Sequence, residues 1–428
     1  MVALSLRQHQ FLIFGFSWVA YAGTYFLRKP LGVIKADLET DLNFTKTQLG
    51  WLDTSLLLPY ALMQMFMGPV GDKFGPRKTF GVSLILSGLS MTSFGLWNSC
   101  YIFAALLFLN GAAQSQCWPS SGKAVSAWFS DSSRNTVFGA YGTSAFAGGI
   151  IGTTLAVYLQ TTYGWRSVYL PPSVFLVIIG VLVLFLYRQP GELGVIVPGK
   201  EPSAKSSASE NQLNSWFEIW KIPCVPEIAL AMLCLKIVRY CMYMWLPMYL
   251  QNHLKYSKGM AGMFSTMFEI GAVFGSAGSG WVIDRCFQSR SVFGTLVSML
   301  LSTLALVLFY LSSEWGIVFN SIFLILAGLF NAGPDVILGG SLPAELGELN
   351  GRKAAAAVVG LVNGFGSIGT FMEGPVVGLV TSVWGWSFMF HLLVMLSLLG
   401  TASVYKAALN YSKQQQLQHS KNEPLIAL

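Results

Sequence analysis

Charged residues are scarce in this chain of 428 residues, where they account for 11% of the positions against 54% for hydrophobic residues. Soluble domains carry about 25% charged residues, which their surfaces need. The mean hydropathy of +0.57 reflects the same imbalance. This composition excludes a soluble globular domain, a disordered chain, a collagen-like chain and a disulfide scaffold. It predicts an all-α protein that crosses a lipid bilayer many times.

Cysteine and histidine are also rare. The six cysteines include no close pair and no Cys-x-x-Cys motif, so neither a disulfide framework nor a zinc site is expected. The four histidines, which do not cluster, are His9, His253, His391 and His419. No metal site, no cofactor motif and no nucleophile–base set is visible, so we do not expect an enzyme.

Acidic residues are outnumbered by basic ones, and the formal net charge is +7. Membrane proteins collect Lys and Arg in cytosolic loops. Nucleic-acid binding would need a basic cluster with interleaved aromatic residues outside the apolar segments, and none is present. With both ends inside, 16 basic residues fall on the cytosolic side. Five fall outside: Lys35, Lys46, Arg166, Lys255 and Lys258. This excess predicts cytosolic termini.

Long apolar segments predict twelve membrane spans, since a spanning helix needs about 20 apolar residues. They lie near residues 11–36, 47–70, 79–97, 101–127, 136–160, 167–187, 226–250, 260–283, 292–311, 317–341, 355–380 and 385–407. A stretch rich in Ser, Pro, Lys and Glu separates the sixth span from the seventh. We therefore expect an N-terminal six-helix bundle over 1–188, a cytosolic linker over 189–224, a C-terminal bundle over 225–408 and an irregular cytosolic tail over 409–428.

Landmarks of the first half recur in the second half at nearly one offset. Asp72 and Asp284 are 212 positions apart, and Arg28 and Arg239 are 211 apart. The Tyr-Gly-Trp motif at 163–165 corresponds to Trp-Gly-Trp at 384–386, 221 positions later. An ordered set of this kind indicates a duplicated six-span unit related by a pseudo-twofold axis. Transporters with such repeats bind their substrate near the bilayer midplane, between the halves.

Ionisable residues occur inside the predicted spans, where each costs about 2.5–3.5 kcal/mol at a helix centre. The nine residues are Arg28, Lys29, Asp53, Lys123, Lys236, Arg239, Glu269, Asp335 and Glu373. They require a polar cavity, ion pairs or both, as found in channels, transporters and receptors.

Two arginines stand out as candidate ligands of an anion. Tyr21, Tyr25 and Arg28 are spaced by four and three residues, so they share one face of a helix. Arg239 is the counterpart of Arg28 in the repeat, and arginine suits bidentate contact with phosphate. The alternative for each arginine is a structural ion pair with Asp53, Glu269, Asp335 or Glu373. Further candidates for the site are Tyr60, Gln64, Trp118 and Lys236. Glu269 is expected to hold Lys236 or Arg239 when the site is empty.

The segment from Gly68 to Lys78 has the pattern Gly-x-x-x-Asp-x-x-Gly-x-Arg-Lys, which resembles the loop signature of the major facilitator superfamily. Asp72 can accept hydrogen bonds at a helix N-terminus, where the dipole favours negative charge. Arg77 can reach the other half on the cytosolic side, and Asp284 repeats the motif. These three residues are predicted to form a cytosolic gate. The alternative is a basic loop with no gating role.

Three strings resemble the organophosphate:phosphate antiporter family of that superfamily. They are Tyr21-x-x-x-Tyr25-Phe-Leu-Arg28-Lys29, Asn110-Gly111-x-x-Gln114-x-x-x-Trp118-Pro119-x-x-Gly122-Lys123 and Arg239-Tyr240-x-x-x-x-Trp245-x-Pro247. The resemblance implies exchange of inorganic phosphate for a phosphorylated small molecule by a rocker-switch movement. It implies substrate contacts by Arg28 and Arg239, an acidic partner at Glu269, and an aromatic cavity at Tyr21, Tyr25, Tyr60 and Trp118. The bacterial members have Lys where this chain has Gln64, His at Ala145 and Asp at Met244, which puts the bacterial substrate in doubt.

The expected partners are phosphate, a small organophosphate and the lipid bilayer, with one chain as the transport unit. The resemblance suggests the endoplasmic reticulum or another endomembrane, with the plasma membrane as the alternative. Two other functions stay open at this point. One is a proton-coupled transporter of another organic anion, and the other is a membrane sensor that binds its ligand without transport.

Overall fold

The computed structural model describes residues 5–66, 74–130, 134–198, 219–286, 291–313, 315–348 and 355–422. Every regular element within these ranges is helical. If helices joined across a short break count as one, the described helices form twelve rods. This is the all-α architecture that the sequence predicted.

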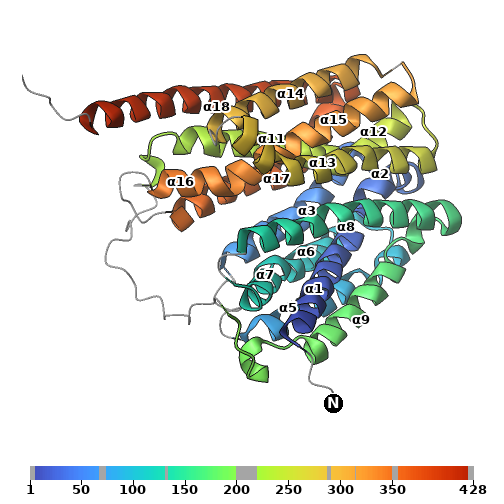
Figure 1. The fold of residues 1–428 in the computed structure, drawn as a ribbon. Helices are drawn as coiled ribbons and strands as arrows, with labels where there is room; N and C mark the ends of the chain where they lie inside the picture. Colours follow the sequence, from blue (N-terminus) through green and yellow to red (C-terminus); the bar gives the residue numbers. More distant parts are fainter. Residues whose placement is uncertain are drawn as a thin grey trace, which may run out of the picture.

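The chain divides into two groups of helices, coloured blue to green and yellow to red in Figure 1. The N-terminal group contains α1 (Leu6–Arg28), α2 (Pro30–Leu42), α3 (Lys46–Phe66), α5 (Pro76–Met91), α6 (Cys100–Gln114), α7 (Cys117–Ala127), α8 (Arg134–Tyr163) and α9 (Leu170–Leu186). The C-terminal group contains α11 (Val225–Met244), α12 (Leu246–Asn252), α13 (Lys258–Cys286), α14 (Ser291–Leu311), α15 (Ile317–Val336), α16 (Leu342–Glu348), α17 (Ala355–Val383) and α18 (Trp386–Asn422). Short 3₁₀ turns lie at Phe94–Leu96, Trp165–Ser167 and Pro190–Leu193, and a π-helical turn at Ile337–Ser341 joins α15 to α16.

The first rod is longer than the predicted span over 11–36. A capping box between Ser5 and Gln8 begins α1. Pro30 does not end the rod, because it occupies the first turn of α2, where its missing N–H and fixed φ are tolerated. The rod therefore continues to Leu42. The seventh rod is interrupted in a similar way, with Pro247 in the first turn of α12 and a bend of 52° between α11 and α12.

The backbone carries the duplication that the sequence landmarks indicated. Asn43 ends α2 with a positive φ of 56°, and Lys255 follows α12 with a φ of 59°, 212 positions later. Gly164 and Gly385 both adopt a φ of 84° in the turns before the last rod of each half. The turns at corresponding points of the two halves thus have nearly equal positive φ values, with the same residue type in one pair and different residue types in the other.

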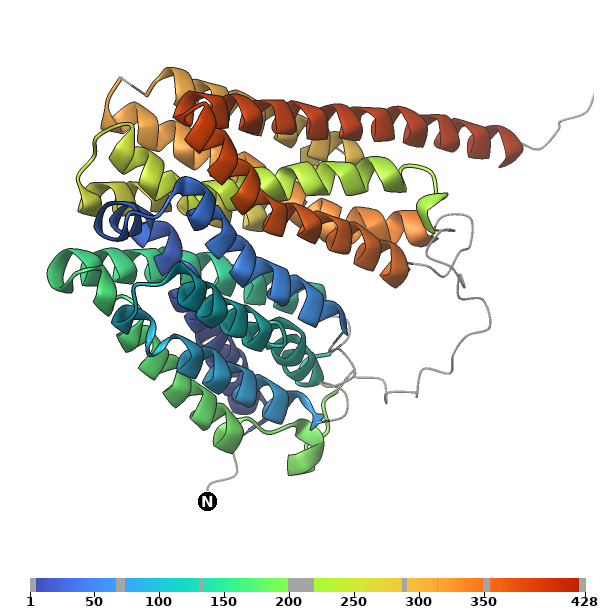
Figure 2. The same cartoon turned by 180° about the vertical axis from the view of Figure 1, so that it is seen from behind.

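The main contacts between the two halves are those of α3 with α17, α8 with α13 and α2 with α12 (Figure 2). The backbones of the two halves touch at Gly50 and Gly374, where a Cβ on either residue would overlap the carbonyl oxygen of the other. Thr54 also donates a hydrogen bond of 2.8 Å to the carbonyl of Phe371. Glycine is required here because the backbones of opposite halves are in direct contact.

Seven described helical segments are long and apolar enough to cross a membrane, and the bent pair α11–α12 makes an eighth. Several of the other rods carry polar residues turned toward the interior, such as Asp53 on α3, Glu269 on α13 and Glu373 on α17. At the C-terminal end, α18 continues to Asn422. The prediction of an irregular tail from residue 409 is therefore wrong as far as residue 422.

Candidate functional site

A cavity of about 660 Å³ lies between the two halves. On α17 the lining residues run from Gly360 to Thr370, whereas the contact with α3 uses Phe371, Gly374 and Gly378. The halves are therefore closed beyond the cavity, at the end that carries α2 and α12. The cavity lies toward the opposite end, where α11 and α17 begin.

Arg28 is buried in the wall of this cavity, at the C-terminal end of α1. Its guanidinium carbon lies 4.3 Å from the ring centroid of Tyr60 and 5.0 Å from that of Tyr25. Its Nε donates a short hydrogen bond to Gln114. Gln114 in turn donates to Asn110 at 2.9 Å and to Ser87 at 3.0 Å, so α5 and α6 fix its orientation. The Nη2 atom of Arg28 is buried and has no hydrogen-bond partner.

Arg239 occupies the corresponding place on α11, and it too is buried in the cavity wall. It forms an ion pair with Asp335 of α15, and its Nε donates a hydrogen bond of 3.1 Å to the Tyr243 hydroxyl. Its guanidinium carbon lies 5.1 Å from the ring centroid of Phe146, which belongs to the other half. Its Nη2 atom is also buried without a partner. Each half thus presents one guanidinium group with an unused donor.

The cavity wall is positively charged. Its cationic residues are Arg28, Lys236 and Arg239, and its anionic residue is Asp335, so their formal net charge is +2. Lys236 lies one turn before Arg239 on α11, as the sequence predicted, and both reach the same cavity. An excess of two positive charges with buried donors suits a doubly charged anion.

Aromatic side chains from several helices form one side of the cavity. Tyr21 lies 4.9 Å from Trp118 between ring centroids, and Trp118 stacks on Tyr141 at 5.1 Å. Trp118 is in the first turn of α7, directly after the break that separates α6 from α7. Tyr21, Tyr25, Tyr60 and Trp118 are therefore brought together, as the sequence predicted.

The ion pairs differ from the predicted ones. Glu269 was expected to hold Lys236 or Arg239, but it pairs with Lys29 of the opposite half. The Lys29 ammonium also lies 3.6 Å from the ring centroid of Tyr243. Arg239 takes Asp335 instead, which was one of the predicted structural alternatives. Glu269 is a buried counter-ion, as expected, but its partner depends on how the helices are rotated, which the sequence does not reveal.

Lys35 was assigned to an outside loop, and that assignment is wrong. It is fully buried on α2 and forms an ion pair of 2.5 Å with Asp53 on α3. The predicted first span ended near residue 36, so Lys35 was counted with the outside loop, whereas the rod continues to Leu42. The signal that could have identified Lys35 is the apolar stretch over 31–34 directly before it, which continues the first span.

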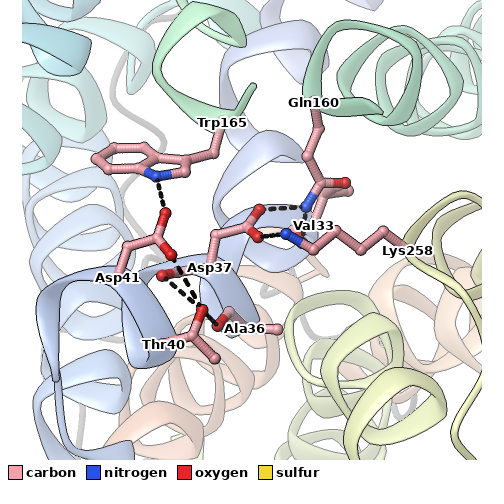
Figure 3. Close-up of polar contacts among 8 residues, drawn as sticks. All are labelled: Val33, Ala36, Asp37, Thr40, Asp41, Gln160, Trp165 and Lys258. Atoms are coloured by element: carbon pink, nitrogen blue, oxygen red, sulfur yellow. Dashed lines mark hydrogen bonds and ion pairs between the residues drawn. The ribbon is translucent and has the colours of Figure 1, made fainter. Parts of the chain in front are cut away.

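The closed end of the molecule is held by polar contacts between the halves (Figure 3). Asp37 of α2 is buried, and Lys258 of α13 forms an ion pair with it. Gln160 of α8 donates a hydrogen bond of 2.5 Å to the same carboxylate. Nearby, Asn252 of α12 donates a hydrogen bond of 2.7 Å to Glu39. We call the Asp37–Gln160–Lys258 group the latch.

Of the predicted gating residues, Arg77 is the one whose side chain the structure describes, and it lies at the other end. Asp72 falls outside the described residues, and the side chain of Asp284, near the end of α13, does too, as does the side chain of Gln64 on α3. Arg77 is described at the start of α5. Arg77 pairs at 3.2 Å with Glu192, which comes directly after the N-terminal half in the sequence, rather than with a residue of the C-terminal half. Within the described part of the chain, Arg77 thus forms no bridge to the C-terminal half in this conformation.

Tyr240 and Tyr243 are among the cavity residues that were missed as site candidates. Both follow Arg239 within about one turn of α11, and Tyr243 shares the helical face of Lys236 and Arg239. The same spacing rule that selected Tyr21 and Tyr25 on α1 would have selected Tyr243 on α11.

A family model described as the Major Facilitator Superfamily matches residues 17–351. The chain belongs to this superfamily. This confirms the predicted fold and the prediction that the protein is a transporter rather than an enzyme.

Several curated proteins are similar to this superfamily member over most of their length. "Putative glycerol-3-phosphate transporter 5" of Arabidopsis thaliana is 27% identical over 90% of this chain and 88% of its own. "Glucose-6-phosphate exchanger SLC37A2" of Xenopus laevis is 26% identical over 88% of each chain. "Probable hexose phosphate transport protein" of Chlamydia pneumoniae is 27% identical over 92% of this chain and 88% of its own. The names of all three refer to the transport or exchange of a phosphate ester.

Among solved structures, the transporter resembles a bacterial homolog of the human lysosomal transporter Spinster in an inward-facing and occupied conformation. The TM-score is 0.76, with 12% sequence identity over 94% of this chain and 97% of the other. At this identity the similarity concerns the fold alone.

Proposed function

We propose that this protein exchanges a phosphorylated small molecule for inorganic phosphate by alternating access. One observation carries the proposal: Arg28 and Arg239, from opposite halves, line one cavity, and each has a buried Nη2 without a partner. A planar guanidinium can form two parallel hydrogen bonds to phosphate oxygens. The named relatives act on glycerol phosphate, glucose 6-phosphate or hexose phosphate, which agrees with this chemistry.

The remaining cavity residues have distinct roles in the proposal. Lys236 adds a third positive charge beside Arg239, so a phosphate dianion meets a wall with a formal charge of +2. Tyr21, Tyr25, Tyr60 and Trp118 surround the organic part of the ester. Glu269 neutralises Lys29 and keeps that lysine from binding the anion directly. Gln64 stays a proposed substrate ligand on the basis of its place in the sequence.

The exchange follows from electrostatics. A bound dianion neutralises the two excess charges, which lets the halves close around it. The empty cavity keeps like charges that repel one another, so the return movement without substrate is disfavoured. Inorganic phosphate or a phosphate ester satisfies the same donors, and each can therefore carry the transporter back.

We infer that both termini are cytosolic, because the basic residues are concentrated on that side and Lys35, now buried, leaves the outer set. With this orientation the conformation described here faces the cytosol. Residues 1–188 and 225–408 act as the two moving halves, joined by the linker 189–224 and followed by a cytosolic tail over 409–428. Asp72, Arg77 and Asp284 form the gate on the cytosolic side when that side closes.

One chain supplies both arginines, so a monomer is a complete transport unit. We place the transporter in an endomembrane, with the endoplasmic reticulum as the first candidate. A fluorescent fusion imaged beside markers of the endoplasmic reticulum, the lysosome and the plasma membrane would test this location.

The proposal is tested by counterflow into liposomes loaded with phosphate. Purified protein is offered labelled phosphate, glucose 6-phosphate, glycerol 3-phosphate and phosphoenolpyruvate in turn. We expect uptake of phosphate and of at least one ester, and only when the liposomes contain phosphate. Arg28→Lys and Arg239→Lys should each reduce exchange to background, because lysine keeps the charge but loses the two-pronged contact. The matched control is Arg7→Lys, which changes an exposed arginine at the start of α1.

Three outcomes would contradict the proposal. Exchange that persists in Arg28→Lys and Arg239→Lys would remove these residues as ligands. Uptake driven by a pH gradient without internal phosphate would favour proton-coupled transport of another anion. Ligand binding without any flux would indicate a sensor on the same fold.

A further inference from the structure

A second group of buried charges lies outside the substrate cavity, at the closed end of the interface. It consists of Lys35 on α2, Asp53 on α3 and Glu373 on α17, with Trp245 between α11 and α12. All four side chains are fully buried, with relative exposures of 0%. Lys35 pairs with Asp53 at 2.5 Å, and its ammonium lies 3.7 Å from the Trp245 ring centroid. None of the four belongs to the cavity wall.

The charges of this group do not balance, because two carboxylates share one ammonium. Both oxygens of Glu373 and the Oδ1 atom of Asp53 have no hydrogen-bond partner. The Trp245 indole lies near both carboxylates but outside hydrogen-bond geometry. A buried carboxylate anion without compensation costs several kcal/mol, and such a group takes up a proton instead.

The other groups around Glu373 do not supply a second positive charge. Facing it are Lys35, Asp53 and Cys241 of α11, and Tyr169, at the start of α9, lies beyond Asp53. On α18, which also packs against α17, the charged Lys406 pairs with Glu227 at 3.2 Å, and His391 lies against the ring of Tyr310. Among the described residues, Lys35 is thus the one cation that interacts with both carboxylates.

The group lies across the contact that alternating access must break. Asp53 belongs to the N-terminal half and Glu373 to the C-terminal half, beside the direct backbone contact of Gly50 with Gly374. When the halves separate at this end, α3 moves away from α17 and water reaches Glu373. A carboxyl group in water is ionised at neutral pH, since exposed glutamate titrates near pH 4.3.

We propose that Glu373 is a proton-binding site, which takes up one proton when this end of the transporter closes and returns it to the same side when the end opens. This inference rests on the proposed transport cycle. The proton adds to a Glu373 oxygen from water at the opening, and on opening it leaves to water, so no proton crosses the membrane. Lys35 stays paired with Asp53 throughout. Low pH on the side of the membrane opposite the termini therefore favours the conformation in which this end is closed.

The coupling between proton binding and closing sets how strongly the conformational equilibrium depends on pH. If closing binds one proton, the ratio of closed to open forms changes by up to tenfold for each pH unit above the titration range of the open form. The test measures this ratio without substrate, so it does not depend on whether phosphate is the substrate.

Spin labels are placed at Tyr163 and Trp315, which are exposed and lie at the closed end of opposite halves. Distances are measured by electron–electron double resonance in nanodiscs at pH 5.5, 6.5 and 7.5, with the other accessible cysteines replaced. In the unmutated sequence, the longer distance should gain population as the pH rises. In Glu373→Gln, which mimics the protonated carboxyl, the short distance should persist at all three pH values.

Asp53→Asn provides a second variant that does not alter Glu373. It leaves one carboxylate for one ammonium, so closing no longer requires a proton, and the pH response should be lost. The matched control is Glu227→Gln, which removes a carboxylate at the opposite end of α11 and should retain the response. A pH response that survives in both Glu373→Gln and Asp53→Asn would overturn the proposal. So would a shift produced by Na⁺ at constant pH, which would indicate a metal ion in place of the proton.

The two proposals fail separately. A transporter that showed the Glu373-dependent shift but no counterflow would contradict the proposed function alone. Counterflow without any pH-dependent shift would contradict this inference alone.

Discussion

At the residue scale, the orientation of the Arg28 guanidinium depends on Gln114. That side chain accepts from Arg28 and donates to Asn110 and Ser87, so its amide is held in one position. The result is that the unused Nη2 of Arg28 belongs to a fixed donor group. A fixed donor binds an anion more tightly than a mobile one, because less side-chain entropy is lost on binding.

We predict that Gln114→Leu weakens substrate binding by roughly tenfold to a hundredfold, as expected for losing a hydrogen bond to a charged group worth about 1.5–3 kcal/mol. The measurement is the concentration dependence of phosphate counterflow, in which the KM should rise. Gln116→Leu is the matched control, since Gln116 contacts the Met63 carbonyl rather than Arg28. An unchanged KM in Gln114→Leu would show that Arg28 is positioned by other contacts.

Residue identities could be predicted from the sequence more fully than residue partners. Arg28 and Arg239 were found because a charge in an apolar segment is costly and because the two positions repeat with one offset. The pairing of Glu269 with Lys29 was not found, since it depends on the rotation and depth of helices from opposite halves. Lys35 was missed for a related reason, because the predicted first span ended near residue 36, whereas the rod continues to Leu42 and carries Lys35 into the interior.

At the element scale, glycine decides how closely α3 and α17 can approach. Gly50 and Gly374 allow the two backbones to touch, and this contact closes one end of the transporter. Small residues such as glycine allow close helix contact, but the 44 glycines of the chain are too many for the sequence to reveal which pair meets across the interface. The structure shows that Gly50 and Gly374, which come from opposite halves, face each other.

Gly374→Ala should keep this end from closing, because the added methyl group would overlap the Gly50 carbonyl oxygen. The distance between labels at Tyr163 and Trp315 should move to the longer value, and counterflow should fall to background. Gly15→Ala on α1, outside the cavity wall, is the control, since a Cβ there meets no atom within 4 Å. A short distance in Gly374→Ala would mean that the helices adjust without separating.

At the scale of the whole molecule, the latch joins the two halves far from the substrate. Lys258 reaches across from α13 to the buried Asp37, whose carboxylate also accepts from Gln160. Breaking the pair leaves a buried carboxylate without its cation, which destabilises the closed end. The latch therefore biases the equilibrium between the two conformations without touching the substrate.

Lys258→Gln is expected to shift this equilibrium toward the form open at the latch by roughly tenfold to a hundredfold, from the loss of a charge-assisted contact of about 1.5–3 kcal/mol. The same pair of spin labels reports the shift. Lys255→Gln removes an equal charge from an exposed position three residues away and should leave the distances unchanged. If both variants behaved alike, the effect would come from net charge and not from the latch.

The net charge of the cavity has an electrical consequence. With two positive charges in excess, a bound dianion leaves the moving assembly neutral, so its passage displaces no charge through the membrane field. An empty carrier or one holding a monoanion would move uncompensated charge, at about 2.3 kcal/mol per elementary charge for every 100 mV. Exchange of one dianion for another should thus be insensitive to membrane voltage, and a dependence on voltage would reveal partners of unequal charge.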